Sequence, residues 1–156
     1  MKMRIISALA VCAGISAPTV AEPTALADCR SEGFTVDTVI VSEQFQSPRQ
    51  FRNGMVTLFQ LQTNHSPYAG AGFAINYYPG EGENMACMGR DMFSSVNIAA
   101  ATAVFVEGEG LTITIPGTVH SGSWNEETEQ PIFDDVITVL RYNPDDGSLI
   151  ALSDTE

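Results

Sequence analysis

Basic residues are the scarcest class in this 156-residue chain, with 7 Lys and Arg against 19 Asp and Glu and a net charge of −12. Two of the seven, Lys2 and Arg4, lie within the first four residues. Nucleic acids and anionic lipid headgroups attract proteins through Lys and Arg. The shortage therefore argues against a nucleic-acid-binding protein and a peripheral membrane protein, whereas scattered acids keep an exported protein soluble.

Long hydrophobic runs are absent after the N-terminus, so we expect no membrane anchor once a leader is removed. The basic start is followed by an apolar stretch, 5–17, of 13 residues, whereas a membrane-spanning helix needs about 20. Small residues before position 22 suit signal peptidase. We predict a signal peptide at 1–21, with cleavage as late as 27 as the alternative. The remainder, 22–156, has the length of a single domain, and its location is predicted to be periplasmic or secreted.

Cysteine is also rare, with 3 residues in the whole chain. Because Cys12 falls in the predicted signal peptide, Cys29 and Cys87 remain. An even pair in an oxidising compartment predicts a disulfide. A redox or metal-binding thiol pair would favour closer spacing, such as Cys-x-x-Cys.

The chain has 2 histidines, His65 and His120, which share no metal-ligand spacing. Two solvated loop histidines are the preferred interpretation, and we expect no cofactor and no resident metal. The alternative is that they converge with Asp91 or Glu126 to hold zinc or a similar ion for hydrolysis. A serine nucleophile beside His120 is disfavoured because the Gly-x-Ser-x-Gly elbow is absent. Acidic clusters at 126–129 and 143–148 lack the spacing of a calcium-binding EF-hand loop.

Alternation of apolar and polar side chains dominates the rest of the chain and predicts short strands. The predicted strands lie near 34–41, 55–62, 71–78, 102–106, 111–115, 136–142 and 149–152. In 55–62, the alternation places Met55, Thr57, Phe59 and Leu61 on one face. Asn53-Gly54 predicts a hairpin turn before that strand.

The segment 92–101 fits either a strand or one short helix, because alanines favour a helix and alternating valines favour a strand. We favour a strand from Thr102 onward, with a helical turn before it. Two segments rich in Gly and Glu, 79–93 and 116–131, are predicted to be long loops, which often carry function.

About seven strands with turns at short intervals predict an all-β fold, mainly an antiparallel β-sandwich or barrel. The chain does not alternate long helices with strands, which argues against a parallel α/β sheet. The 22–156 segment is therefore predicted to be one exported β-domain.

The one concentration of basic and aromatic residues surrounds Phe51. Arg49 and Arg52 flank this ring, and a guanidinium suits a carboxylate or phosphate group. The alternative is an edge strand whose charges discourage aggregation. Tyr68 and Trp124 are expected in or beside loops, where aromatic residues often serve as contact anchors.

The sequence favours a non-catalytic binding or interaction module that uses loops 63–70, 79–93 and 116–131. Its partner is an unknown protein or small molecule, and its oligomeric state is left open. The candidate contact residues are Arg49, Arg52, His65, Tyr68, His120 and Trp124. Two alternatives stay open: a small hydrolase that uses His120 with a metal or carboxylate, and a structural envelope component that pairs through a strand edge.

Overall fold

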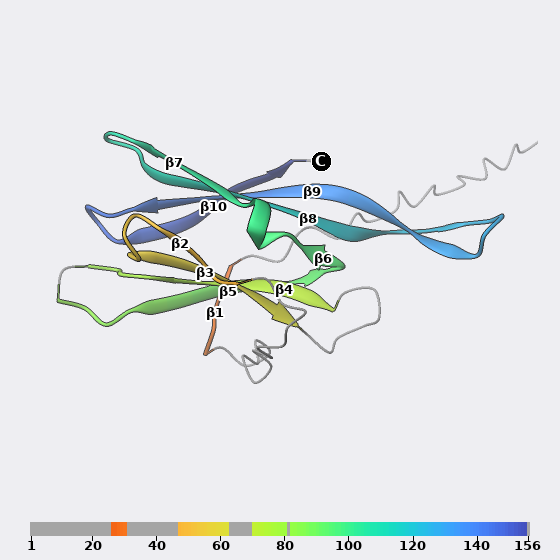
Figure 1. The fold of residues 1–156 in the computed structure, drawn as a ribbon, viewed down its shortest axis with the longest axis horizontal. Coiled ribbons are helices and arrows are strands. Elements are labelled where there is room, and N and C mark those ends of the chain that lie inside the picture. Colours follow the sequence, from red (N-terminus) through yellow and green to blue (C-terminus); the bar gives the residue numbers. More distant parts are fainter. Residues whose placement is uncertain (1–25, 31–46, 63–69, 81, 156) are drawn as a thin grey trace, which may run out of the picture.

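The computed structural model describes residues 26–30, 47–62, 70–80 and 82–155. Two antiparallel sheets pack face to face as the two layers of a sandwich (Figure 1). Sheet A has the order β1-β5-β4-β3-β2, and sheet B has the order β10-β9-β8-β6, with β7 also paired to β8. The predicted all-β fold is therefore confirmed, and it is a sandwich because the sheets do not close into a barrel.

Sheet A contains β1 (Ala27–Asp28), β2 (Arg49–Phe51), β3 (Val56–Gln62), β4 (Ala71–Tyr77) and β5 (Ala86–Phe93). Sheet B contains β6 (Ser95–Val96), β7 (Thr102–Val106), β8 (Gly110–Asn125), β9 (Gln130–Asn143) and β10 (Ser148–Thr155). The described residues thus hold ten strands rather than about seven. Three of them, β1, β2 and β6, are only two or three residues long, too short for alternation to reveal. The predicted strand at 34–41 lies outside the described residues.

The segment that links β6 to β7 within sheet B follows the sequence prediction of a helical turn before a strand at Thr102. A single 3-10 turn, η2 (Ile98–Ala100), precedes β7. The Asn97 side chain accepts a hydrogen bond of 3.0 Å from the backbone N–H of Ala100 and so caps this turn. Ile98 is fully buried, which fixes the turn between the layers.

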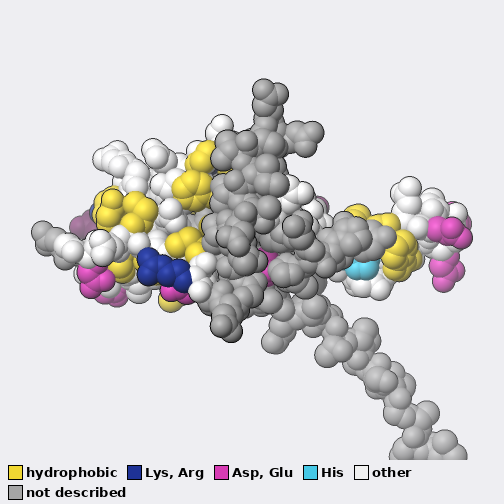
Figure 2. Space-filling view, turned by 90° about the horizontal axis from the view of Figure 1, so that it is seen from below, with side chains coloured by type: hydrophobic (Ala, Val, Ile, Leu, Met, Phe, Trp, Pro, Cys, Tyr) yellow, Lys and Arg dark blue, Asp and Glu magenta, His cyan; other side chains and the backbone are white. Residues whose placement is uncertain are grey.

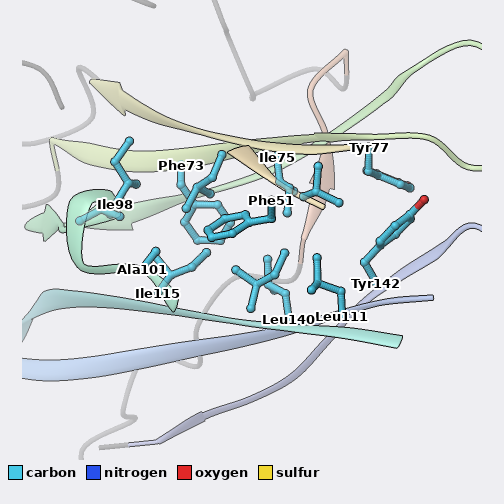
Figure 3. Packing of buried hydrophobic residues seen from close by; sticks show 14 of the residues in the cluster. Phe51, Phe73, Ile75, Tyr77, Ile98, Ala101, Leu111, Ile115, Leu140 and Tyr142 are labelled. Carbon is cyan, nitrogen blue, oxygen red and sulfur yellow. The ribbon is translucent and has the colours of Figure 1, made fainter. Parts of the chain in front are cut away.

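The core lies between the layers, where inward side chains of both sheets meet (Figure 3). Phe73 and Ile75 on β4 face Ile115 and Leu140 of sheet B (Figure 3). In these strands every second side chain points into the core, although Ala74 on the opposite face of β4 is buried as well. Near one end of the core, the Tyr142 hydroxyl donates a hydrogen bond of 2.9 Å to the Tyr78 carbonyl oxygen.

The alternation in β3 did not show which face meets the main core. Val56 and Leu58 are fully buried in that core. Leu61 is buried as well, but it packs with Ala74 in a second cluster beside the disulfide. Both faces of this strand are therefore covered, and alternation alone could not tell which one meets the other sheet.

The predicted loops at 79–93 and 116–131 are also corrected by the structure. Residues 86–93 form β5, whose pattern is broken by Arg90, a buried cation stacked 5.4 Å from the Phe93 ring. Most of 116–131 belongs to the β8–β9 hairpin. The outer part of that hairpin is paired through its backbone ladder and has no buried residues, so it lacks the apolar alternation that marks a core strand.

The predicted disulfide joins Cys29, next to β1, to Cys87 on β5, with a Cα–Cα distance of 5.5 Å. The Cys29 N–H also donates a hydrogen bond of 3.1 Å to the Cys87 carbonyl oxygen. Across the described ranges, no helix has the length and apolar character needed to cross a membrane.

Candidate functional site

Four of the six predicted contact residues fall in two separate regions of the described structure. Arg49 and Arg52 lie at the β2–β3 hairpin, and His120 and Trp124 lie on the β8–β9 hairpin. The β2–β3 turn and the tip of the β8–β9 hairpin are at opposite ends of the long axis (Figure 1). The other two, His65 and Tyr68, lie outside the described residues.

The far end of the β8–β9 hairpin projects beyond the sandwich (Figure 1). Val119 and Val136 are the last side chains of this hairpin that pack against the main core. We call residues 120–135 the arm. None of its residues is buried, so its conformation depends on cross-strand pairing and on its turn.

The turn of the arm is organised by Asn125. Its side-chain oxygen accepts hydrogen bonds from the N–H groups of Glu127, at 2.9 Å, and Thr128, at 3.0 Å. Its carbonyl oxygen accepts a further bond of 2.9 Å from Glu129 N–H. An Asn side chain that bonds to the backbone two or three residues ahead defines the turn locally. The arm is thus a structured hairpin, although it buries no side chain.

Three rings form what we call the aromatic cluster of the arm: His120, Trp124 and Phe133. The His120 ring contacts Trp124 and Phe133 edge-on, with centroids 6.1 and 5.9 Å away. His120 and Phe133 are direct cross-strand partners. The register then shifts before Trp124, in a segment where Gly122 has a φ of +80°. Beyond this irregularity, Trp124 pairs with Pro131 in the ladder, and its ring contacts the His120 ring.

Two of the three rings in the aromatic cluster are open to solvent, while His120 is half-buried. Trp124 is 49% exposed and Phe133 is 45% exposed, and the adjacent Ile132 is exposed as well. Backbone N–H of Gly122 donates a hydrogen bond of 3.2 Å to His120 Nδ1, which orients the imidazole within the cluster. An exposed group of aromatic side chains is typical of protein contact surfaces.

The arm is also acidic throughout. Residues 120–135 contain no Lys or Arg, and their acidic residues are Glu126, Glu127, Glu129, Asp134 and Asp135. Figure 2 shows hydrophobic, histidine and acidic side chains together at the end of the molecule that the arm forms. The arm therefore combines an apolar contact surface with a strongly negative field.

The hydrolase alternative required His120 to meet carboxylates or a metal. Within the described ranges, no group of three or more His, Cys, Asp and Glu residues could hold a metal ion. The ring contacts seen for His120 are with aromatic side chains. The zinc site postulated with Asp91 or Glu126 therefore gains no support from this geometry.

The second region lies at the edge where the two sheets meet. Arg52, in the turn after β2, has its guanidinium carbon 4.3 Å from the centroid of Phe105 on β7. Arg49 stacks 5.7 Å from the Phe51 ring and donates a hydrogen bond to the Ala99 carbonyl oxygen. A cavity of about 460 Å³ opens beside them. Its lining consists of Gln50, Phe51, Arg52, Ala103, Phe105 and Leu111.

Sequence reasoning missed Phe133 and Phe105, because the role of each depends on a residue outside its own strand. A usable signal existed for Phe133. The polar turn at 125–129 is flanked by His120 on one side and Phe133 on the other at similar distances, which is the pattern of a cross-strand pair in a hairpin. Nothing comparable marks Phe105, whose contact with Arg52 joins two different sheets.

Comparisons of the chain with protein-family models, with curated proteins and with solved structures found no match. The functional argument therefore depends on the geometry and charge of these two regions.

Proposed function

We propose that this protein is an exported, non-catalytic binding module and that the arm is its contact element. The observation that carries the proposal is the exposed aromatic cluster on a hairpin that extends beyond the core. Of the loops expected to bind, 116–131 largely coincides with the arm, 63–70 lies outside the described residues, and much of 79–93 is strand β5.

The exposed rings supply the free energy for binding. An aromatic side chain presents about 150–250 Å² of surface. Roughly half of the Trp124 and Phe133 surfaces is exposed. Burying that half of each ring in an interface is worth about 2–3 kcal/mol at about 25 cal/mol per Å². These two rings are therefore the expected centre of the contact.

The charge of the arm selects the kind of partner. Five acidic and no basic residues at 120–135 attract a protein that carries Lys and Arg around an apolar groove. The same charge repels nucleic acids and other copies of this acidic chain. Such attraction weakens as salt rises, because the screening length is about 10 Å at 0.1 M ionic strength.

The disulfide and the predicted signal peptide support our proposal for the compartment. A stable Cys29–Cys87 bridge indicates an oxidising environment. Together with the N-terminal signal pattern, it leads us to propose that the protein acts in a periplasm or outside the cell.

Site-specific photo-crosslinking tests the proposal in the cell that exports the protein. Trp124 is replaced by the photoreactive amino acid p-benzoylphenylalanine, and Ile150 on β10 is replaced in the same way as the matched control. The two side chains are 49% and 50% exposed, but only Trp124 is on the arm. We expect a discrete protein adduct at Trp124 that weakens with added salt and is missing at Ile150. No adduct at Trp124, or the same adduct at both positions, would refute the proposal.

A second candidate, a structural envelope component, is favoured by the edges of sheet B. Among the described strands, β7 and β10 each pair on one side only. Val104, Val106, Ile150 and Leu152 on these edges are exposed, and apolar edge strands are prone to pair with another chain. Light scattering after size-exclusion chromatography tests this candidate. Oligomers that Val104→Lys dissociates would support it, whereas a monomer at every concentration would exclude it.

A further inference from the structure

We infer that the cavity beside Arg52 binds a small aromatic carboxylate, with its ring between the two sheets and its carboxylate on the guanidinium. We call this site the Arg52 cavity. It is distant from the arm along the molecule, and it does not rest on the function proposed for the arm.

The walls of the Arg52 cavity are mostly apolar and come from both layers. Phe51 of sheet A and Leu111 of sheet B are buried core residues that form its floor. Phe105 on β7 is 50% exposed and forms an outer wall, while Ala103 leaves space because its side chain is small. The volume of about 460 Å³ lies within the usual range for small-molecule sites, about 300–1,000 Å³.

Arg52 supplies the polar end of the site. Its backbone is fixed by the turn, in which Gly54 N–H bonds to the Phe51 carbonyl oxygen and Met55 N–H bonds to that of Arg52. Its guanidinium lies over the Phe105 ring. A guanidinium held against an aromatic ring keeps donors free at its edge, and two of them match the oxygens of a carboxylate.

The charge of Arg52 is not neutralised within the described part of the chain. Arg141, by contrast, forms an ion pair of 3.2 Å with Glu109. No described carboxylate forms such a pair with Arg52, although the chain contains 19 acidic residues. A ligand with an apolar body and a carboxylate would fill the apolar cavity and neutralise Arg52 at its rim.

The sequence also allowed a second interpretation of Arg49 and Arg52, in which their charges keep an edge strand from aggregating. That role needs charge at the edge but needs no cavity, and it predicts no preference between a charged and a neutral ligand. The two interpretations therefore differ in a measurable way.

Titration calorimetry with two matched probes tests the inference. Naphthoate carries a carboxylate, and naphthamide has nearly the same shape without the charge. We expect naphthoate to bind the wild-type protein at least about tenfold more tightly, as befits a hydrogen bond to a charged group. Comparable affinities for the two probes, or no binding of either, would overturn the inference without any variant.

Two arginine variants show which side chain causes the preference for naphthoate. Arg52→Gln is expected to weaken naphthoate binding by about tenfold or more and to leave naphthamide binding unchanged. Arg141→Gln removes a cation that already has an acidic partner, and is expected to leave both affinities unchanged. Far-UV circular dichroism confirms that each variant is folded. Full naphthoate affinity in folded Arg52→Gln, or equal losses in both variants, would contradict the assignment.

Discussion

Removal of the Cys29–Cys87 disulfide is expected to lower the free energy of unfolding by about 4 kcal/mol. The two cysteines are separated by 58 residues, and the chain-entropy relation gives about 4 kcal/mol for a loop of that length. Small domains have total stabilities of about 5–15 kcal/mol. The bridge therefore accounts for a large fraction of the stability of this protein.

The folded structure indicates what would be lost with the bridge. Strand β1 has two residues, and its ladder in sheet A is with β5 alone. The disulfide packs with Leu61 and Ala74 on the face of sheet A that is turned away from the main core. We therefore expect β1 to detach when the bridge is removed, while the sandwich core remains folded at a lower stability.

The assay compares the wild-type protein with the Cys29→Ser, Cys87→Ser double variant in equilibrium urea unfolding. Far-UV circular dichroism is the better probe, because the single Trp124 is on the exposed arm and reports little about the core. With a urea dependence of about 2 kcal/mol per M, the midpoint should fall by about 2 M. A reducing agent should shift the wild-type midpoint to that of the double variant and leave the double variant unchanged.

A loss of less than about 1 kcal/mol would refute this reasoning, because it would mean that the 58-residue loop does not restrict the unfolded chain as the entropy relation requires. We also expect the sandwich core to stay folded without the bridge. A double variant that lacks the native circular dichroism spectrum in the absence of urea would contradict this expectation. The main core would then depend on β1.

Three further predictions concern the core, a turn and the arm. Burial raises the pKa of Tyr142 above 10.0, so the unfolded chain loses the hydroxyl proton at a lower pH than the folded protein does. The free energy of unfolding should therefore fall as the pH rises through the folded pKa. Urea unfolding at alkaline pH measures this fall, which should be less steep in Tyr142→Phe. Gly147 has a φ of +68°, and a Cβ there would lie 1.3 Å from the Pro79 carbonyl oxygen, whereas Gly108, with a φ of +79°, faces open space. Gly147→Ala should lower the thermal midpoint well beyond the backbone cost of about 1–2 kcal/mol expected for Gly108→Ala, and equal midpoints would show that the contact with Pro79 does not matter. Trp124→Ala should change the unfolding free energy by less than about 0.5 kcal/mol, and a larger loss in urea unfolding would mean that the arm supports the core.

The strands with one buried face could be predicted from sequence. Alternation identified β8 through Ile113 and Ile115, because this strand places every second side chain in the core. It also identified β4 through Phe73 and Ile75, although Ala74 on the other face is buried beside the disulfide. The same reasoning found β3 as a strand but not its inward face, because β3 has the main core on one side and the disulfide cluster on the other. It missed β5, where the buried cation Arg90 interrupts the apolar pattern.

The sequence alone predicted only some of the residues of each candidate site. Arg52 and Trp124 were selected by residue type, since a guanidinium and an exposed aromatic ring have recognisable uses. Their neighbours were not, because Phe105 reaches Arg52 across two sheets and Phe133 reaches the His120 ring through the β8–β9 hairpin. Whether either site binds a partner is decided by the experiments described above.

By itself, the sequence determined the all-β class, the acidic charge and the pair of cysteines available for a bridge, because these depend on composition and on periodicity within single strands. Only the tertiary structure decided that 116–131 is largely an extended hairpin and that Arg52 lies beside an apolar cavity. Those features depend on which strands pair and in what register, and such long-range contacts leave no periodic signal in the local sequence.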